Sequence, residues 1–141
     1  MASDVRYEVR GLRELKAAFR KVEGDLKTEL KEGFKAIAED VAGAIRPKVP
    51  KRTGRAAGSV KARGSLRGGA IAFGGSAAPY YPWLDFGGRV GINKRIARDF
   101  LTEGRYVYPT IREKRDDIIE HTDDLIGHLA RKAGFETTGD N

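Results

Sequence analysis

The sequence contains no cysteine, and this absence removes several kinds of chemistry at once. Disulfides, thiolate nucleophiles and thiolate metal sites are excluded, and the composition fits a reducing compartment. Long apolar runs are also missing, since no stretch approaches the roughly 20 residues that span a bilayer. The N-terminus has no basic-then-apolar signal pattern. We therefore expect neither membrane insertion nor export by a signal peptide.

Internal repeats and low-complexity segments are absent too. A length of 141 residues fits one domain, so we predict a single domain over residues 1–141. The hydrophobic fraction of 40% and the charged fraction of 33% are ordinary for a globular protein. Its 18 glycines are more than average, and those between Gly54 and Gly91 make the middle of the chain rich in turns.

Acidic residues are missing from the middle of the chain, between Val41 and Leu84. Because this segment is rich in lysine and arginine, it accounts for the whole net charge of +7. A local excess of one charge predicts a local partner of the opposite charge, either nucleic acid or an acidic protein surface. The eight basic residues are Arg46, Lys48, Lys51, Arg52, Arg55, Lys61, Arg63 and Arg67.

Two periodicities describe the N-terminal third. Alternation over Val5–Val9 predicts a short, half-buried strand. Spacings of three or four then predict one helix over residues 12–46, about 50 Å long, which must either break at Gly24 or project toward a neighbour. The apolar stripe consists of Leu12, Leu15, Phe19, Val22, Leu26, Leu30, Phe34, Ile37, Val41 and Ile45.

A proline- and glycine-containing basic hinge over residues 47–58 ends this helix, because proline lacks a donor and clashes with the preceding turn. Two strands, 59–63 and 70–73, should follow as a hairpin joined by a glycine-bearing loop, with Val60 and Ala62 inward. We predict that the hinge contacts DNA or a partner protein; a solvated charge run is the alternative. The candidate contact residues are Arg46, Lys48, Lys51, Arg52, Thr53, Gly54 and Arg55.

An aromatic element follows over residues 78–88. Its two prolines predict an edge strand or an extended loop. Such aromatic density indicates either core packing or an interface between subunits, since tryptophan and tyrosine are enriched at binding hot spots. The candidate residues are Tyr80, Tyr81, Trp83, Asp85 and Phe86.

The C-terminal part combines a loop, a strand and a helix. Residues 88–104 predict a loop, with a short basic helix through Ile92, Ile96 and Phe100 as the alternative. A predicted strand over 105–108 completes the sheet region 59–108. The last helix is predicted over 109–134, starting at Pro109 and ending at Gly134, and a frayed tail follows over 135–141. The predicted fold class is α+β: a small, mostly antiparallel sheet with a long N-terminal and a shorter C-terminal helix.

Signals for catalysis are weak. His121 and His128 lie seven residues apart, too far for a helical metal pair, and read as surface residues. The acidic pairs 116–117 and 123–124 fit a solvated helix face, although a metal-dependent hydrolase remains the enzymatic alternative. The glycine-rich stretches lack the spacing of a phosphate-binding loop. We predict no enzyme, no cofactor and no metal.

The order of several motifs resembles a known family. The motifs are Gly-Leu-x-Glu-Leu at 11–15, Pro-x-Arg-Thr-Gly at 50–54 before Ser59-Val60, Tyr-x-x-x-Asp-Phe-Gly at 81–87 and a proline-led helix after Tyr108. Together they resemble the neck, or head–tail joining, family of long-tailed bacteriophages, the gene-ten-like family of lambdoid siphoviruses, also called tail-completion proteins. Two departures are Asp85 in place of the commoner glutamate and the insertion of residues 88–104 before the aromatic-proline stretch.

The resemblance implies a non-enzymatic virion protein, assembled in the host cytoplasm and located at the head–tail junction. It would form a homo-oligomeric ring between the portal or head-completion proteins and the tail-terminator and tube, with DNA passing through. Lys48, Lys51, Arg52 and Arg55 would face DNA or the adjacent ring, while Trp83 and Phe86 pack within and between subunits. A tail-terminator ring protein and a small, non-specific nucleic-acid-binding protein are the alternatives.

Overall fold

The computed structural model describes residues 2–7 and 25–134 of the chain. The predictions for Leu12–Gly24, including the break at Gly24, and for the tail 135–141 lie outside these residues. The elements in order are β1 Ala2–Arg6, α2 Asp25–Ile45, the 3₁₀ turn η1 Arg46–Lys48, α3 Arg55–Ser59, β2 Lys61–Gly64, β3 Gly69–Gly74, η2 Gly75–Ala77, α4 Tyr81–Phe86, β4 Gly88–Val90, η3 Ile92–Lys94, β5 Ile96–Arg98, α5 Val107–Glu113 and α6 Arg115–Lys132.

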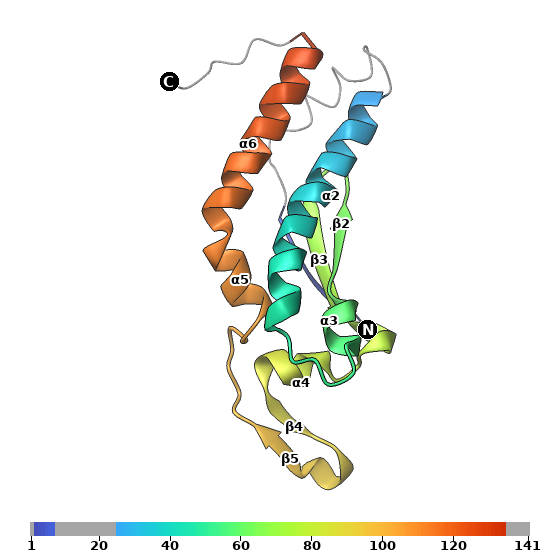
Figure 1. Ribbon diagram of the computed structural model, residues 1–141, viewed down its shortest axis with the longest axis vertical. Helices are drawn as coiled ribbons and strands as arrows, with labels where there is room; N and C mark the ends of the chain where they lie inside the picture. Colours follow the sequence, from blue (N-terminus) through green and yellow to red (C-terminus); the bar gives the residue numbers. More distant parts are fainter. Residues whose placement is uncertain (1, 8–24, 135–141) are drawn as a thin grey trace.

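The predicted α+β class is confirmed. The main sheet is antiparallel in the order β1-β3-β2, and α2 packs across β2 and β3. In Figure 1 helix α2 lies between the sheet and helices α5 and α6. Ile111 of α5 and Ile118 of α6 also reach the sheet, because they line one pocket with Val5 of β1 and Ile71 of β3. The molecule is elongated along α2 and α6. Among the described residues, no helix is both long and apolar enough to cross a membrane.

The hairpin of β2 and β3 is confirmed, but its first strand begins at Lys61, because the last residues of the predicted hinge and Ser59 form the short helix α3. The strands pair from Lys61↔Ala72 to Gly64↔Gly69. Val60 is fully buried, whereas Lys61 and Arg63 are exposed, as the alternation requires. The first strand lies earlier than predicted, at Ala2–Arg6, because it pairs antiparallel with β3 in the register Ala2↔Gly74 to Arg6↔Ala70. The last two residues of the predicted strand, Glu8 and Val9, lie outside the described residues.

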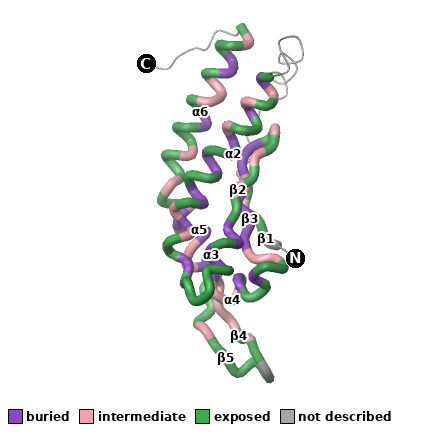
Figure 2. The backbone as a smooth tube through the Cα atoms, turned by 45° about the vertical axis from the view of Figure 1, so that its right-hand side comes forward, coloured by how far each residue is buried: buried purple, intermediate pink, exposed green. Residues whose placement is uncertain are grey.

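The apolar stripe of α2 forms the centre of two core clusters (Figure 2). Its described members, Leu26, Leu30, Phe34, Ile37, Val41 and Ile45, are all buried. At one end Leu26, Leu30 and Phe34 pack with Leu129 of α6, and at the other end Val41 and Ile45 join residues of α3, β3, α4 and α5. A side chain is excluded at Gly64, where a Cβ would lie 2.3 Å from the Lys31 carbonyl oxygen, so glycine allows β2 to approach α2.

The predicted extended conformation of residues 78–88 is wrong, since Tyr81–Phe86 is the helix α4. Pro82 lies in its first turn, where a missing N–H breaks no hydrogen bond. Tyr81 and Asp85, four residues apart, both face the core and are joined by a hydrogen bond of 3.1 Å. Gly87, with φ of 89°, ends the helix.

Residues 88–98 form neither the predicted loop nor the alternative helix, because they contain the strands β4 and β5. The strands β4 and β5 pair from Gly88↔Arg98 to Val90↔Ile96 and form a separate hairpin that extends from the end of α4 away from the helices (Figure 1). The turn of this hairpin requires left-handed backbone at Gly91, Asn93 and Lys94. A two-stranded unit of three-residue strands carries too short an alternation for the sequence pattern to reveal it.

The strand predicted over residues 105–108 is also wrong, because α5 already begins at Val107. The N–H groups of Arg105, Tyr106 and Val107 donate to the carboxylate of Asp85 rather than to a neighbouring strand. The C-terminal helix otherwise follows its prediction: Ile118, Leu125 and Leu129 pack inward, and the chain bends only at Lys114. Gly134, with φ of 88°, follows the C-cap as expected.

Candidate functional site

The eight basic residues of the acid-free segment are divided among three places. Arg46 and Lys48 form bonds within the chain. Lys51, Arg52 and Arg55 are exposed on the loop before α3 and at its first residue. Lys61, Arg63 and Arg67 are exposed on β2 and the loop that follows it. The sequence therefore identified the charge correctly, but the fold separates it into surfaces with different roles.

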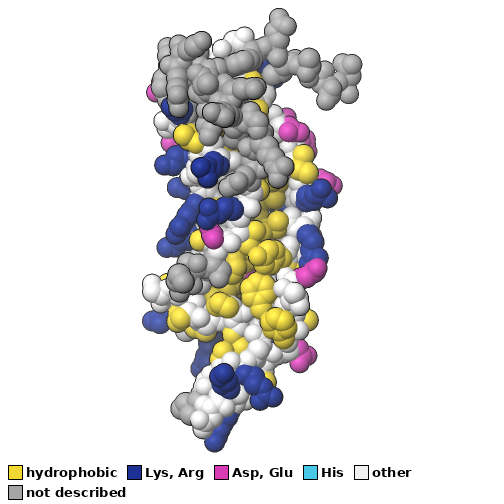
Figure 3. Space-filling view, turned by 180° about the vertical axis from the view of Figure 1, so that it is seen from behind, with side chains coloured by type: hydrophobic (Ala, Val, Ile, Leu, Met, Phe, Trp, Pro, Cys, Tyr) yellow, Lys and Arg dark blue, Asp and Glu magenta, His cyan; other side chains and the backbone are white. Residues whose placement is uncertain are grey.

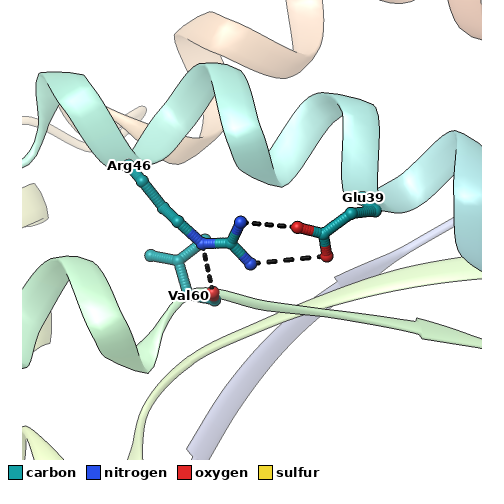
Figure 4. Close-up of polar contacts among 3 residues, drawn as sticks. All are labelled: Glu39, Arg46 and Val60. Atoms are coloured by element: carbon teal, nitrogen blue, oxygen red, sulfur yellow. Dashed lines mark hydrogen bonds and ion pairs between the residues drawn. The ribbon is translucent and has the colours of Figure 1, made fainter.

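Arg46 joins the end of α2 to the start of the sheet (Figure 4). Its Nε donates to the carbonyl oxygen of Val60 at 3.0 Å, and its two terminal nitrogens donate to the carboxylate of Glu39 at 2.5 and 3.4 Å. The hydrogen bond from Arg46 lowers the pKa of Glu39 below its usual value. Arg46 thus fixes the direction in which the chain leaves α2.

Lys48 joins the hinge to α5. Its Nζ donates to Thr110 Oγ1 at 3.1 Å and to Glu113 Oε2 at 2.6 Å. The hydrogen bond from Lys48 lowers the pKa of Glu113. Thr110 is fully buried, so this contact orients the hinge from inside the protein. Lys48 is itself exposed, but its ammonium group is bonded within the chain. Among the described residues, the side chains of Lys51, Arg52 and Arg55 are exposed and form no ion pair.

The hinge and the aromatic element face each other across one open pocket of about 460 Å³. The hinge contributes a rim with two exposed guanidinium groups, and α4 with the residue before it contributes an apolar wall. Gly54, with φ of 78°, allows the chain to turn from the loop into α3. The lining residues are Pro50, Arg52, Thr53, Gly54, Arg55, Ala56, Tyr80, Trp83 and Leu84. The pocket thus brings together part of each predicted cluster, namely Arg52, Thr53, Gly54 and Arg55 of the hinge and Tyr80 and Trp83 of the aromatic element. The other predicted residues, Arg46, Lys48, Lys51, Tyr81, Asp85 and Phe86, do not line it.

Asp85 has a different role from the exposed part of the aromatic element, because it is completely buried. Its Oδ1 accepts from the N–H groups of Arg105 at 2.6 Å and Tyr106 at 2.9 Å. Its Oδ2 accepts from Val107 N–H at 3.2 Å and from the Tyr81 hydroxyl at 3.1 Å. Burial, and then the negative charge of Asp85, raises the pKa of Tyr81. Asp85 thus caps the N-terminus of α5 from another helix.

Of the predicted aromatic residues, Tyr81 belongs to the core and Tyr80 to the surface. Tyr81 is completely buried and packs against Phe73, with ring centroids 5.0 Å apart. Tyr80 is 39% exposed, while Trp83 and Phe86 are half-buried. Tyr81 is therefore a core residue, whereas the interface interpretation stays a prediction for Tyr80, Trp83 and Phe86.

Trp83 connects the pocket wall to the β4–β5 hairpin. Its indole N–H donates to the carbonyl oxygen of Gly88 at 3.1 Å, and the guanidinium of Arg98 lies 5.7 Å from its ring centroid. Arg98 in turn donates to the Tyr106 hydroxyl at 2.7 Å. These contacts fix the hairpin relative to the pocket.

The β4–β5 hairpin is a second charged surface, in a segment for which the sequence predicted a loop or a short basic helix. Arg89, Lys94 and Arg95 are exposed on it, and Figure 3 shows lysine and arginine side chains gathered at this tip of the molecule. The basic character of this hairpin is visible in the sequence, because no acidic residue lies between Phe86 and Arg98. Asp85 separates this run from the basic hinge in the sequence, whereas the fold buries its carboxylate in the core.

Large apolar side chains are also exposed at this end. Ile96 is 54% exposed, Phe100 69% and Leu101 44%. Apolar anchors beside cationic groups are typical of protein interfaces rather than of a solvated surface. The residues considered for catalysis show no such grouping: His121 and His128 are both exposed, as are the acidic pairs of α6. Within residues 2–7 and 25–134, no cluster of three or more potential metal ligands exists.

The described residues thus form an α+β protein with a basic-rimmed apolar pocket next to a cationic hairpin. Comparisons with protein-family models, with curated proteins and with solved structures found no match to this chain. Functional conclusions therefore depend on the geometry of this site and on the sequence motifs.

Proposed function

We propose that this chain is a structural protein of the head–tail connector, or neck, of a long-tailed bacteriophage. In this proposal it oligomerises as a ring that joins the portal and head-completion assembly to the tail, with DNA passing through the channel. The observation that carries the proposal is the convergence of two motifs at one pocket. Pro50, Arg52, Thr53 and Gly54 of the first motif line it together with Trp83 and Leu84, which stand at variable positions within the second.

The shape and surface chemistry of the molecule support an assembly role. The segment between α2 and α3 and the β4–β5 hairpin lie toward the same end of an elongated chain (Figure 1). Both carry exposed cations, and Ile96, Phe100 and Leu101 are exposed apolar residues on or next to the hairpin. Such a surface suits contact with a phosphate backbone or an acidic protein ring, because both partners accept charge-assisted hydrogen bonds that do not depend on a nucleotide sequence. A ring requires two different complementary patches on each subunit, since its interfaces are heterologous.

The proposal is tested with the double variant Lys51→Glu, Arg52→Glu in the phage that encodes the chain. Both residues are exposed, so the variant should fold normally but block the joining of heads to tails. Electron microscopy should then show separate heads and tails, with the wild-type chain located at the junction of intact particles. The matched control is Lys61→Glu, Arg67→Glu, which makes the same change in net charge elsewhere. Intact infectious particles from the hinge variant, or a location outside the junction, would contradict the proposal.

A second candidate function, non-specific nucleic-acid binding outside a particle, is favoured by the cationic β4–β5 hairpin. This function predicts that the isolated chain binds duplex DNA with an affinity that falls steeply with salt, by about 0.9 log units per log unit for each phosphate contact. Fluorescence anisotropy would measure it, with Arg89→Ala, Lys94→Ala as the test variant. Salt-sensitive binding by a chain that never associates with heads or tails would favour this candidate over the connector. A tail-terminator ring would instead be recognised by its position one layer further along the particle.

A further inference from the structure

The pocket between the hinge and α4 is apolar inside and cationic at its rim. Arg52 and Arg55 are exposed there, and within residues 2–7 and 25–134 no carboxylate forms an ion pair with either. With a volume of about 460 Å³, the pocket has room for a phenyl ring and a neighbouring apolar side chain. Its occupant should therefore combine bulky apolar side chains with an adjacent negative charge.

One segment of the same chain has this chemistry. Phe100 is the most exposed large apolar residue of the described chain at 69%, and Leu101 beside it is 44% exposed. Asp99 directly precedes them, and in the described part of the chain no cation forms an ion pair with its carboxylate. The sequence Asp99-Phe100-Leu101 thus matches the pocket in both charge and polarity.

The backbone of this segment is held in place although its side chains are exposed. Leu101 N–H donates to the Phe86 carbonyl oxygen at 2.7 Å, and the guanidinium of Arg105 donates to the carbonyl oxygens of Asp85 and Asp99. Asp99 also lies so close to Gly87 that a Cβ there would be 2.0 Å from its carbonyl oxygen. An apolar side chain on a fixed backbone loses little conformational entropy on binding, which is the property of a preformed anchor.

None of the segment's residues lines the pocket of its own chain. We infer that Phe100 of one copy inserts into the pocket between the hinge and α4 of a second copy, where Arg52 and Arg55 of that copy face Asp99. Because the anchor and the pocket are different patches, the contact is head-to-tail and generates a ring or an open filament. The inference rests on the proposed connector function, since it names the surfaces through which neighbouring subunits meet.

Two surface variants of the full chain separate the two halves of this contact. Phe100→Asp removes the anchor, and Arg52→Glu, Arg55→Glu reverses the rim. Each should weaken self-association by about 30-fold or more, the change that a hot-spot residue produces. Sedimentation velocity measures the association, and circular dichroism checks that each variant is folded. The control Lys61→Glu, Arg67→Glu should assemble like the wild type, because these residues lie outside the pocket.

Mixing the two variants gives the sharpest test. The rim variant keeps its anchor and the Phe100→Asp variant keeps its pocket, so an equimolar mixture contains one functional contact. Heterodimers should form and growth should stop there, whereas each variant alone stays monomeric. The inference would be overturned if each variant formed dimers by itself, or if the mixture formed rings.

Several results distinguish this inference from the proposed function. A Phe100→Asp chain that assembles like the wild type overturns the inference, while a wild-type chain found at the head–tail junction still supports the connector. A control variant that loses assembly as fully as the rim variant shows that bulk charge controls association, which also overturns the inference. A wild-type chain that stays monomeric at all concentrations also overturns the inference. A chain whose Phe100-dependent rings form but which is absent from particles contradicts the proposed function only.

Discussion

Replacement of Asp85 by asparagine tests the central structural claim, that this carboxylate holds the site together. The substitution keeps the size of the side chain and one carbonyl oxygen, which can still accept from the N–H groups of Arg105 and Tyr106. It places an NH₂ group where Oδ2 accepts from the Val107 N–H at 3.2 Å. The Tyr81 hydroxyl can rotate to accept, but the Val107 N–H cannot.

The expected cost follows from these contacts. A buried N–H without an acceptor costs about 1–3 kcal/mol, and hydrogen bonds to a charged acceptor lose roughly half their strength when the acceptor becomes neutral. Loss of the negative charge at the N-terminus of α5 adds about 0.3–1 kcal/mol. We therefore expect Asp85→Asn to lower the free energy of unfolding by about 2–4 kcal/mol. Tyr81→Phe, which removes one of the four donors, should cost about 1 kcal/mol.

Urea unfolding followed by tryptophan fluorescence is a direct assay, since Trp83 is the single tryptophan and lies beside the site. At a slope of about 1–3 kcal/mol/M the midpoint should fall by about 0.7–4 M. Asp123→Asn is the matched control, because this carboxylate is exposed on α6 and lies outside the site. If Asp85→Asn unfolds within about 0.5 kcal/mol of the control, the reasoning that Asp85 caps α5 is refuted.

Three further predictions test the packing and the ionisation of the structure. Gly64→Ala should destabilise the protein by about 1–3 kcal/mol, because the new methyl group would meet the backbone of α2. Gly43→Ala, where no atom lies within 4 Å of the new methyl group, should stabilise the protein by about 1 kcal/mol. Equal effects of the two variants on thermal unfolding would contradict the close approach of β2 to α2. The raised pKa of Tyr81 means that its contribution to stability is complete below pH 10.0 and is lost as the pH rises above it, so Tyr81→Phe should flatten the alkaline fall in stability, and an unchanged slope would count against this. The lowered pKa of Glu39 means that its ion pair with Arg46 stabilises the folded state above pH 4.5, and that this stabilisation is lost as the pH falls below 4.5. Glu39→Gln should therefore lower the free energy of unfolding by about 0.5 kcal/mol at neutral pH and leave it unchanged at about pH 2, as measured by urea unfolding at both pH values.

Local pattern was a good guide wherever one face of an element is buried over several turns. The stripe of α2, the inward Val60 and outward Lys61 of the hairpin, and the apolar face of α6 all follow from periodicity. The same reasoning failed for the short elements between residues 78 and 108. Their conformation depends on Asp85, whose four donors come from two different segments, and sequence spacing gives no information on that meeting.

The sequence alone determined the composition of the candidate site: a basic hinge after a long helix and an aromatic element some 25 residues later. Tertiary structure decided which of these residues are available to a partner. It holds Arg46 and Lys48 within the chain, buries Tyr81 and Asp85, and brings the remaining hinge residues to the exposed side of α4. The physical reason is that charge and aromaticity are properties of single residues, whereas exposure and pairing depend on which distant backbone and side-chain groups the fold places next to them.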